Sequence, residues 1–384
     1  MKTNNKCMPS LALMTANRYN SILSGAIAQK RGKMADKSIK VKQLADVLGL
    51  DETTIRRKIN NNEIQALIAG RGFIATDTAV THYNFTQEHK KTLDTMPTKA
   101  SVISFVNHKG GCSKTTTAYT IAAMLQMFGN KVLLVDMDPQ GNSTQSVLEP
   151  YINEEGITLP FPKTIKDLLL KKKNIGSADI LFDEVIRPSR FGFDAIPCDL
   201  SLNSIMQDLE SSSFKEVILK ELLNEVSHKY DYIIIDTPPT LGFSVVSSLT
   251  ASDYVLIVTI AEAFSILGVE QTLNLIQSVK RQNSVLANPR VMKILGIAIS
   301  KAEMLTNISS HFVSELEKFA EKNTLHIYRE DIIPKTTKIP ETQALNVLIT
   351  DYDAKGEAAL SYFNISLLID IEVKKDKIKE KLSK

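Results

Sequence analysis

The chain has 384 residues, of which 43% are hydrophobic and 23% charged, a composition that suits a globular protein of two or three domains. No apolar run approaches the roughly 20 residues of a membrane span, no signal-peptide pattern opens the chain, and the three scattered cysteines form no C-x-x-C pair, so a cytoplasmic protein without disulfides or structural zinc is expected. The net charge of +3 hides an asymmetry, because residues 1–97 hold 15 Lys/Arg against 8 Asp/Glu, which suggests that this part contacts nucleic acid.

The first 36 residues are predicted to form a helix, because their apolar side chains recur at a loose helical spacing. Residues 37–96 follow as a second compact unit. Within it, residues 41–60 ("VKQLADVLGLDETTIRRKIN") have the spacing of a helix-turn-helix, with Ala45 where the helices cross and Gly49 in the turn, where φ must be positive. The core positions of this helix pair are Leu44, Leu48, Leu50 and Ile55.

The second helix of the pair, about Glu52 to Asn60, exposes short polar and basic side chains that suit base edges and phosphates. The stretch "IQALIAGRGFIAT" that follows predicts a small β-hairpin wing. An ordinary helix pair with a solvated basic face is the alternative, but the spacing, the basic helix and the charge asymmetry together favour DNA binding. The candidate DNA-binding residues of this unit are Thr53, Thr54, Arg56, Arg57, Lys58 and Arg71.

Residues 88–100 are polar and contain a proline, which predicts a linker. Beyond residue 101, runs of Val, Ile and Leu alternate with helical stretches such as 213–228 and 266–282. This alternation predicts a mostly parallel sheet that is covered by helices on both faces. The expected strands lie within residues 101–109, 131–140, 230–239, 253–261 and 293–300.

The stretch "KGGCSKTT", Lys109 to Thr116, lies between a predicted strand and a predicted helix, the context of a phosphate-binding loop. Gly110 and Gly111 allow backbone N–H groups to approach phosphate oxygens, Lys114 would contact the β- and γ-phosphates, and Thr115 would bind Mg²⁺. The loop departs from the common pattern G-K-[ST], because Ser113 stands where a glycine precedes the lysine. A plain glycine turn is the alternative, which the lysine-threonine pair disfavours.

Three aspartates follow two of the predicted strands. Asp136 and Asp138 end "LLVDMDPQGN", and Asp236 ends "IIIDTPP". A single aspartate after a strand could merely cap the next helix. Three of them beside one phosphate loop instead indicate carboxylates that organise a metal ion and a water molecule.

The segments "KGGCSKTT", "VDMDPQGN" and "IIIDTPP" resemble, in order and spacing, the three nucleotide motifs of the ParA/MinD family of deviant P-loop ATPases, over roughly residues 100–370. The resemblance implies a mostly parallel, doubly wound α/β sheet, preceded by an N-terminal helical arm and a winged-helix or helix-turn-helix domain. The expected domains are residues 1–36, a helix that pairs two chains, residues 37–96, which bind DNA, and residues 97–384, the ATPase.

The resemblance also implies roles for single residues. The catalytic candidates are Lys109, which would reach the phosphates of a partner chain, Lys114, which would bind those of its own site, and Asp138, which would position the attacking water. The metal candidates are Thr115, Asp136 and Asp236. The segment "DIIPKTTKIPETQ" would lie beside the adenine, so the nucleotide-binding candidates are Lys109, Gly110, Gly111, Cys112, Ser113, Lys114, Thr115, Thr116, Pro334 and Lys335.

Two residues depart from the family pattern. Ser113 replaces the usual glycine, and Lys301 stands where many members carry an Asn or Asp that contacts the base, which leaves base recognition unassigned. Family members also coat nucleoid DNA without sequence preference when ATP-bound. The candidates for that contact are Lys301, Lys335 and Lys338.

The expected function is plasmid partition by slow ATP hydrolysis, with ATP/ADP and Mg²⁺ as cofactors. The resemblance implies a homodimer, operator binding with autorepression through the helix-turn-helix, nucleoid-associated DNA binding, and stimulation by a ParB-type centromere-binding protein. A nucleotide-switched transcriptional regulator is one alternative. A membrane-cycling ATPase of MinD type is another, although the lysine-rich C-terminus lacks the wide apolar face that a membrane helix needs.

Overall fold

The computed structural model describes residues 38–70, 72–96, 99–172, 181–210, 217–240, 242–283, 292–304 and 306–383. Its contacts divide the chain into two units, residues 1–37 and residues 38–384. The helix predicted over residues 1–36 and the predicted wing residue Arg71 therefore lie outside the described residues.

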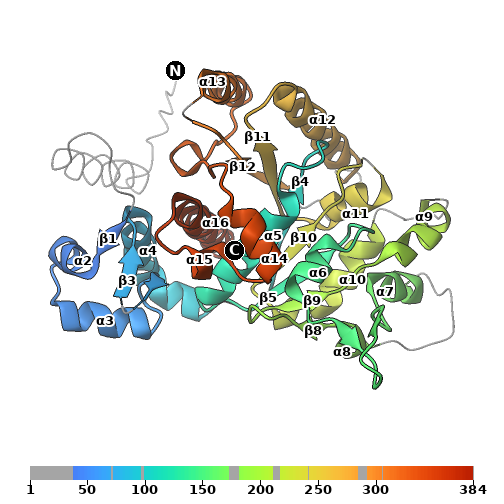
Figure 1. Cartoon of the computed structure of the whole chain (residues 1–384), viewed down its shortest axis with the longest axis horizontal. Helices are drawn as coiled ribbons and strands as arrows, with labels where there is room; N and C mark the ends of the chain where they lie inside the picture. Colours follow the sequence, from blue (N-terminus) through green and yellow to red (C-terminus); the bar gives the residue numbers. More distant parts are fainter. Residues whose placement is uncertain are drawn as a thin grey trace, which may run out of the picture. The chain divides into compact units, whose positions relative to one another are not determined.

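A seven-stranded sheet forms the centre of the second unit (Figure 1). Its strand order is β12-β11-β4-β10-β5-β9-β8, and the pairs are parallel except for β8 with β9. All five strands predicted from hydrophobic runs are present, and the predicted mostly parallel sheet is confirmed. The strands are β4 (Ser101–Val106), β5 (Val132–Asp136), β8 (Arg187–Pro188), β9 (Asp194–Ile196), β10 (Tyr232–Asp236), β11 (Tyr254–Ile260) and β12 (Lys293–Ser300).

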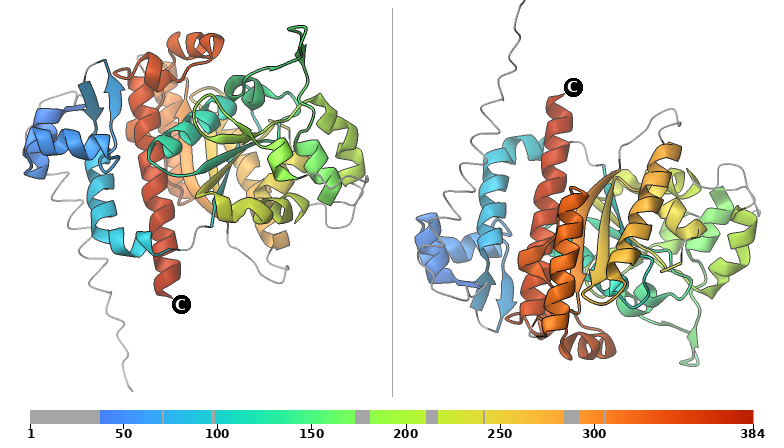
Figure 2. Two further views of the ribbon diagram at one scale, coloured as in Figure 1. Left: turned by 90° about the horizontal axis from the view of Figure 1, so that it is seen from below. Right: turned by 90° about the horizontal axis from the view of Figure 1, so that it is seen from above.

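Side chains of each strand alternate between two apolar layers, because successive residues of a strand point to opposite faces. On β4, Ile103 and Phe105 pack with α5 and α16, whereas Val102 packs on the opposite face with α10 and α11. Figure 2 shows the sheet between these helices. The helices of this region are α5 (Lys114–Met127), α6 (Asn142–Val147), α7 (Ile165–Lys172), α8 (Phe182–Val185), α9 (Asn203–Glu210), α10 (Ile218–Val226), α11 (Phe243–Ala251), α12 (Ser265–Asn283), α13 (Asn307–Lys322), α14 (Lys338–Leu345), α15 (Ile349–Tyr352) and α16 (Glu357–Leu382).

The described residues between 38 and 75 form two short helices and a small antiparallel sheet of order β1-β3-β2. The predicted turn is present, since Gly49 has a φ of 66°, and the predicted core residues Leu44 and Ile55 are fully buried. The expected second helix and hairpin are found at the expected residues. These elements are β1 (Ile39–Lys40), α2 (Val41–Leu48), α3 (Glu52–Asn60), β2 (Leu67–Ala69) and β3 (Gly72–Ala75).

Helix α4 (Asp77–Asp94) corrects the prediction of a linker over residues 88–100, because its last turns run through residues 88–94. The helix packs against α16 along its length (Figure 2). Thr76, the N-cap of α4, donates its hydroxyl to Asn364 Oδ1 at 2.6 Å. The linker prediction rested on the polar composition of residues 88–94 and on the proline at position 97. Neither feature shows that one face of a helix is covered by another helix, as it is here.

A buried ionic cluster joins α4 to α16 at Asp370, whose side chain is fully buried. Its Oδ2 lies 2.6 Å from Nε2 of the buried His82 and 2.7 Å from Nζ of Lys374. Its Oδ1 accepts from the Tyr232 hydroxyl at 2.7 Å and from Asn130 Nδ2 at 3.4 Å. Burial acts to raise the pKa of Asp370, but the Lys374 ammonium and the His82 ring outweigh it and hold that pKa well below its usual range.

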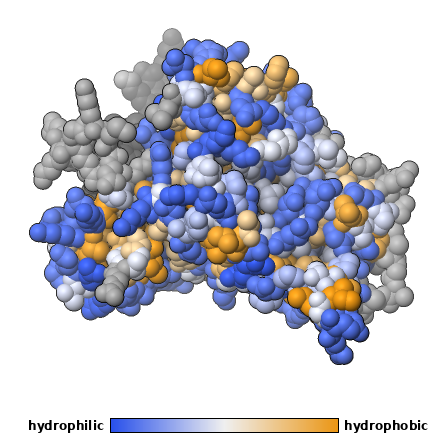
Figure 3. All heavy atoms as spheres, viewed as in Figure 1, coloured by the Kyte–Doolittle hydropathy of each residue, from blue (hydrophilic) through white to orange (hydrophobic). Residues whose placement is uncertain are grey.

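A second pair of short strands, β6 (Tyr151–Ile152) and β7 (Thr158–Leu159), forms an exposed hairpin after α6. The face of the molecule in Figure 3 is mostly hydrophilic, with scattered apolar patches. Among the residues that the structure describes, none of the helices combines the length and the apolar character needed to cross a membrane.

Candidate nucleotide-binding site

The loop predicted to bind phosphate connects the central strand β4 to helix α5, at the carboxyl edge of the sheet. Gly111 and Ser113 have φ values of 72° and 68°, so the backbone turns twice through the left-handed region. Ser113 is the N-cap of α5, yet its side chain makes no capping hydrogen bond. Within the described part of the chain, the N–H groups of Gly111, Cys112 and Ser113 donate to no oxygen or nitrogen acceptor and remain available to an anion.

Lys114 lies at the first position of α5 and is only 6% exposed. Its Nζ has two weak neighbours, the carbonyl oxygen of Lys109 at 3.4 Å and Sγ of Cys112 at 3.9 Å. It forms no ion pair with any of the described carboxylates. A buried ammonium group that makes no ion pair at contact distance is costly, and a bound anion would reduce that cost.

Asp136 and Asp236 end the neighbouring strands β5 and β10 and stand opposite each other in register. Asp136 accepts three hydrogen bonds: its Oδ2 accepts from the N–H and the hydroxyl of Thr144 at 2.9 and 2.7 Å, and its Oδ1 accepts from the N–H of Asp138 at 3.0 Å. Asp236 Oδ2 accepts from the Ser143 hydroxyl at 2.7 Å. Asp236 Oδ1 is buried and has no hydrogen-bond partner among the described residues.

Burial raises the pKa of both carboxyl groups. For Asp136 the charge of Asp236 adds to the effect, whereas for Asp236 the hydroxyls of Ser143 and Thr115 and the charge of Lys114 oppose it and leave the pKa at about 6. A divalent cation beside Asp236 would satisfy the free oxygen and offset the repulsion between the two groups. No cluster of three His, Cys, Asp or Glu in the described ranges could hold a metal alone, so further ligands would come from Thr115 and a bound phosphate.

Asp138 is buried in the loop after β5, where its Oδ1 accepts from the N–H of Gln140 at 3.0 Å. Lys109 is directed away from its own loop. Its Nζ lies 3.0 Å from Glu262 Oε2 and 3.4 Å from the carbonyl oxygen of Ala263, on the segment after β11. The structure therefore groups Lys114, Thr115 and the aspartates in one cluster, and holds Lys109 at its rim.

The residues expected near the base, Pro334 and Lys335, lie beside Ala302, just after the end of β12. Pro334 pairs with Ala302 in an isolated parallel β-bridge. The N–H of Lys335 donates to the carbonyl oxygen of Ala302 at 3.0 Å. The three lysines expected to contact nucleoid DNA are all engaged within the chain: Lys301 with Gly111, Lys335 with Glu303 and Lys338 with Asp353.

The candidate DNA-binding residues of α3 differ in solvent exposure and in whether their side chains already have a partner within the chain. Thr53, Arg56 and Arg57 are exposed. Thr54 is used by the helix itself, because its N–H and hydroxyl donate to the N-cap Asp51 at 2.9 and 2.6 Å. Lys58 pairs with Glu63 at 2.7 Å.

The site contains residues that sequence reasoning missed. Ser143 and Thr144, at the start of α6, hold Asp236 and Asp136 respectively, and Gln343 Nε2 donates to Thr116 Oγ1 at 2.7 Å. The serine and threonine directly follow "VDMDPQGN", so their position after a strand-end aspartate pair was a usable signal. Gln343 carried no such signal in the sequence, because it belongs to α14, far along the chain from the phosphate loop.

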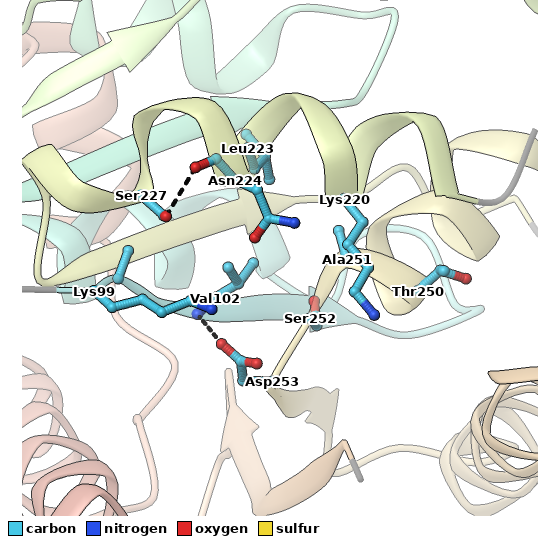
Figure 4. A pocket seen from close by; sticks show the side chains of 11 residues that line it. Lys99, Val102, Lys220, Leu223, Asn224, Ser227, Thr250, Ala251, Ser252 and Asp253 are labelled. Atoms are coloured by element: carbon cyan, nitrogen blue, oxygen red, sulfur yellow. Dashed lines mark hydrogen bonds between the residues drawn. The ribbon is translucent and has the colours of Figure 1, made fainter. Parts of the chain in front are cut away.

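A separate pocket lies at the opposite, amino-terminal end of β4, between α10 and the end of α11 (Figure 4). Its lining includes Lys99, Lys220 and Asp253, and Asp253 Oδ2 accepts from the N–H of Val102 at 3.1 Å. None of the predicted site residues belongs to it.

The AAA domain family model matches residues 100–290. The chain is 34% identical over 259 residues to the chromosome-partitioning ATPase Soj of Treponema pallidum, which covers 67% of this chain and 92% of the relative. It is 31% identical over 266 residues to the chromosome partitioning protein ParA of Myxococcus xanthus, covering 69% and 86%. Among solved structures, a plasmid partition protein of Borrelia burgdorferi bound to AMPPNP superposes with a TM-score of 0.54 at 26% identity, covering 72% of this chain and 100% of that one.

Both sequence relatives pass 30% identity over most of their own length, and the loop, the buried lysine and the strand-end aspartates occupy the carboxyl edge of a parallel sheet. The chain belongs to the ParA/MinD family of P-loop ATPases.

Proposed function

We propose that this protein is an ATP-hydrolysing DNA partition protein that binds ATP and ADP with Mg²⁺ at the loop of residues 109–116. The observation that carries the proposal is the buried Lys114, which forms no ion pair with a described carboxylate and lies beside unoccupied N–H donors at a helix N-terminus. A triphosphate supplies the missing negative charge. Mg²⁺ would be held by Thr115, by the free oxygen of Asp236 and by phosphate oxygens, with Asp136 holding Asp138 in place.

Replacing Lys114 with alanine tests the site. We expect ATP and ADP affinity to fall about 30-fold, because a charged donor to phosphate is worth about 2 kcal/mol. The measurement is titration of each nucleotide by calorimetry. Lys131→Ala, an exposed lysine beyond the end of α5, is the matched control and should bind normally. Equal affinities for the wild type and Lys114→Ala would refute the proposed site.

We propose that hydrolysis takes place in a homodimer in which each Lys109 serves the partner's nucleotide. The contacts of Lys109 Nζ with Glu262 and with the carbonyl oxygen of Ala263, on the segment after β11, support this arrangement. We further propose that the ATP-bound dimer binds nucleoid DNA without sequence preference and that a ParB-type centromere-binding protein stimulates hydrolysis and releases it, in the cytoplasm. Measuring turnover with and without DNA and a candidate partner tests these steps.

Residues 37–96 are proposed to be a winged helix-turn-helix that binds the operator of the protein's own operon, with residues 1–36 pairing two chains and residues 97–384 forming the ATPase. The spacing of α2 and α3, the turn at Gly49 and the exposed Arg56 and Arg57 support this proposal. Asp51 caps the N-terminus of α3. The face of α3 that carries Arg56 and Arg57 is exposed to solvent.

Arg57→Ala should weaken operator binding about tenfold, because a single base or phosphate contact of arginine contributes roughly 1–3 kcal/mol. The measurement is a titration of operator DNA at several salt concentrations, in which a phosphate contact also lowers the salt slope by about one. Lys91→Ala, an exposed lysine on α4, controls for the loss of a positive charge. If both variants bind as the wild type does, α3 is not the recognition helix.

A nucleotide-switched repressor is a second candidate function, favoured by one contact. Asn62, directly after α3, donates its Nδ2 to the carbonyl oxygen of Met127 at 2.9 Å, at the carboxyl end of α5. Helix α5 begins at Lys114, so one helix connects the phosphate loop with the proposed recognition unit. Loss of plasmid inheritance in Lys114→Ala with operator binding intact would separate partition from repression.

A further inference from the structure

The phosphate loop makes two hydrogen bonds with the residues at the end of strand β12. The hydroxyl of the buried Ser300 lies 2.9 Å from the carbonyl oxygen of Cys112, the nearer of its two acceptors, and 3.2 Å from that of Thr259. Lys301 donates its Nζ to the carbonyl oxygen of Gly111 at 2.8 Å. Two successive carbonyl groups of the loop are therefore fixed by two successive residues that lie far away in the sequence.

Fixing these carbonyls also sets the direction of the N–H groups, because the C=O and N–H of a trans peptide unit point in opposite directions. The carbonyls of Gly111 and Cys112 share their peptide units with the N–H groups of Cys112 and Ser113. A donor that fixes the oxygen therefore also fixes the direction in which the N–H of the same peptide unit points. Those two N–H groups are among the ones with no oxygen or nitrogen acceptor in the described chain.

The loop needs such support because it contains a strained residue. Ser113 has a φ of 68°, where a residue with a Cβ is disfavoured by roughly 1–2 kcal/mol and glycine is not. Its side chain offers no capping bond in return. Lys301 is itself at a φ of 52°, so the residue that reaches the loop is also held in an unfavourable conformation.

We propose that Ser300 and Lys301 are positioning residues that keep the phosphate loop in its binding conformation, and that Lys301 compensates for the serine at position 113. The inference rests on the proposed nucleotide site and adds to it a residue whose ammonium group acts through the loop backbone. Lys301 thereby has a structural role in this chain, where the sequence alone suggested a contact to DNA.

The test is a double-mutant cycle between Lys301→Ala and Ser113→Gly, with ADP as the ligand and calorimetry as the readout. Lys301→Ala should weaken ADP binding about tenfold, the effect of losing a charged hydrogen bond that holds a strained loop. In the Ser113→Gly background the same substitution should cost less than about threefold, because glycine adopts the turn unaided. Lys301→Arg should restore affinity, since arginine also donates to a carbonyl.

Steady-state kinetics give a second readout. A loop that is held equally in the ground and transition states changes KM and leaves kcat nearly unchanged. Lys301→Ala should therefore raise KM for ATP about tenfold with kcat within twofold. Lys355→Ala, an exposed lysine outside the site, is the control for charge.

The outcomes are distinguishable. If the wild-type protein binds no ADP, the proposed function fails and the inference with it. If the wild type binds and Lys301→Ala binds equally well, the inference alone fails. If Lys301→Ala loses the same affinity in both backgrounds, Lys301 contacts the nucleotide directly, and its action through the loop is refuted.

Discussion

Replacing Lys109 with alanine is expected to lower ATP hydrolysis by about 10³-fold while ADP affinity stays within a few-fold of the wild type. The side chain points to Glu262, 3.0 Å away, and not into its own phosphate cradle, so it adds little to binding in the same chain. A cation that a partner supplies to the transferring phosphoryl group contributes mainly to the transition state, where negative charge spreads over the oxygens. Phosphate release under saturating MgATP is the measurement.

Mixing two inactive variants tests the in-trans arrangement. In a dimer of Lys109→Ala with Lys114→Ala, one site keeps its own Lys114 and receives Lys109 from the other chain. Hydrolysis should therefore return to roughly a quarter of the wild-type rate after random mixing, because half of the dimers are mixed and each holds one complete site. Lack of any recovery would show that Lys109 acts within its own chain, and an unchanged rate in Lys109→Ala alone would remove it from the mechanism.

Asp370→Asn is expected to lower the free energy of unfolding by about 3 kcal/mol, because it removes a fully buried carboxylate and leaves the partly buried Lys374 ammonium without its partner. The carboxylate also holds His82 of α4 at 2.6 Å, so its loss affects both sides of the α4–α16 contact. Urea unfolding followed by far-UV circular dichroism gives the measurement. Asp376→Asn, which removes a partly exposed ion pair with Lys293, is the control and should cost less than about 1 kcal/mol.

The same group makes stability depend on pH. Its pKa is depressed in the folded chain, so its contribution is fully present above the unfolded value near 3.9 and is lost as pH falls through the folded pKa. The wild type should therefore lose stability on acidification below about pH 4, and Asp370→Asn should lack that component of the loss. Parallel curves for the two proteins would mean that other carboxylates dominate acid unfolding.

Much of the central fold could be predicted, because a strand that is buried on both faces must be a continuous apolar run. Strands β4, β5, β10, β11 and β12 all follow this rule. Strands β8 and β9 were missed because two or three residues give no periodicity to detect. The linker prediction over residues 88–100 was wrong because a polar sequence does not show that one face of a helix will be covered by another.

The site was predictable where its parts lie on one segment and unpredictable where distant segments meet. The loop and the strand-end aspartates are local motifs, and the parallel sheet alone brings them to one edge. The position of Asp136 opposite Asp236 depends on the register of two strands. The hydrogen bonds that Asp136 accepts from Thr144 and from the N–H of Asp138 depend on how the following loop folds. The contact of Lys301 with Gly111 joins residues 190 positions apart, which no local pattern reveals.

Helix α16 has a consequence for how the chain can be divided. It packs against α5 of the sheet region on one side and against α4 on the other, and Asp370 accepts hydrogen bonds from both directions. A fragment beginning at residue 97 would uncover the α4-facing side of this helix and open a buried carboxylate to water. The ATPase expressed without residues 1–96 should therefore be prone to aggregate through the exposed face of α16.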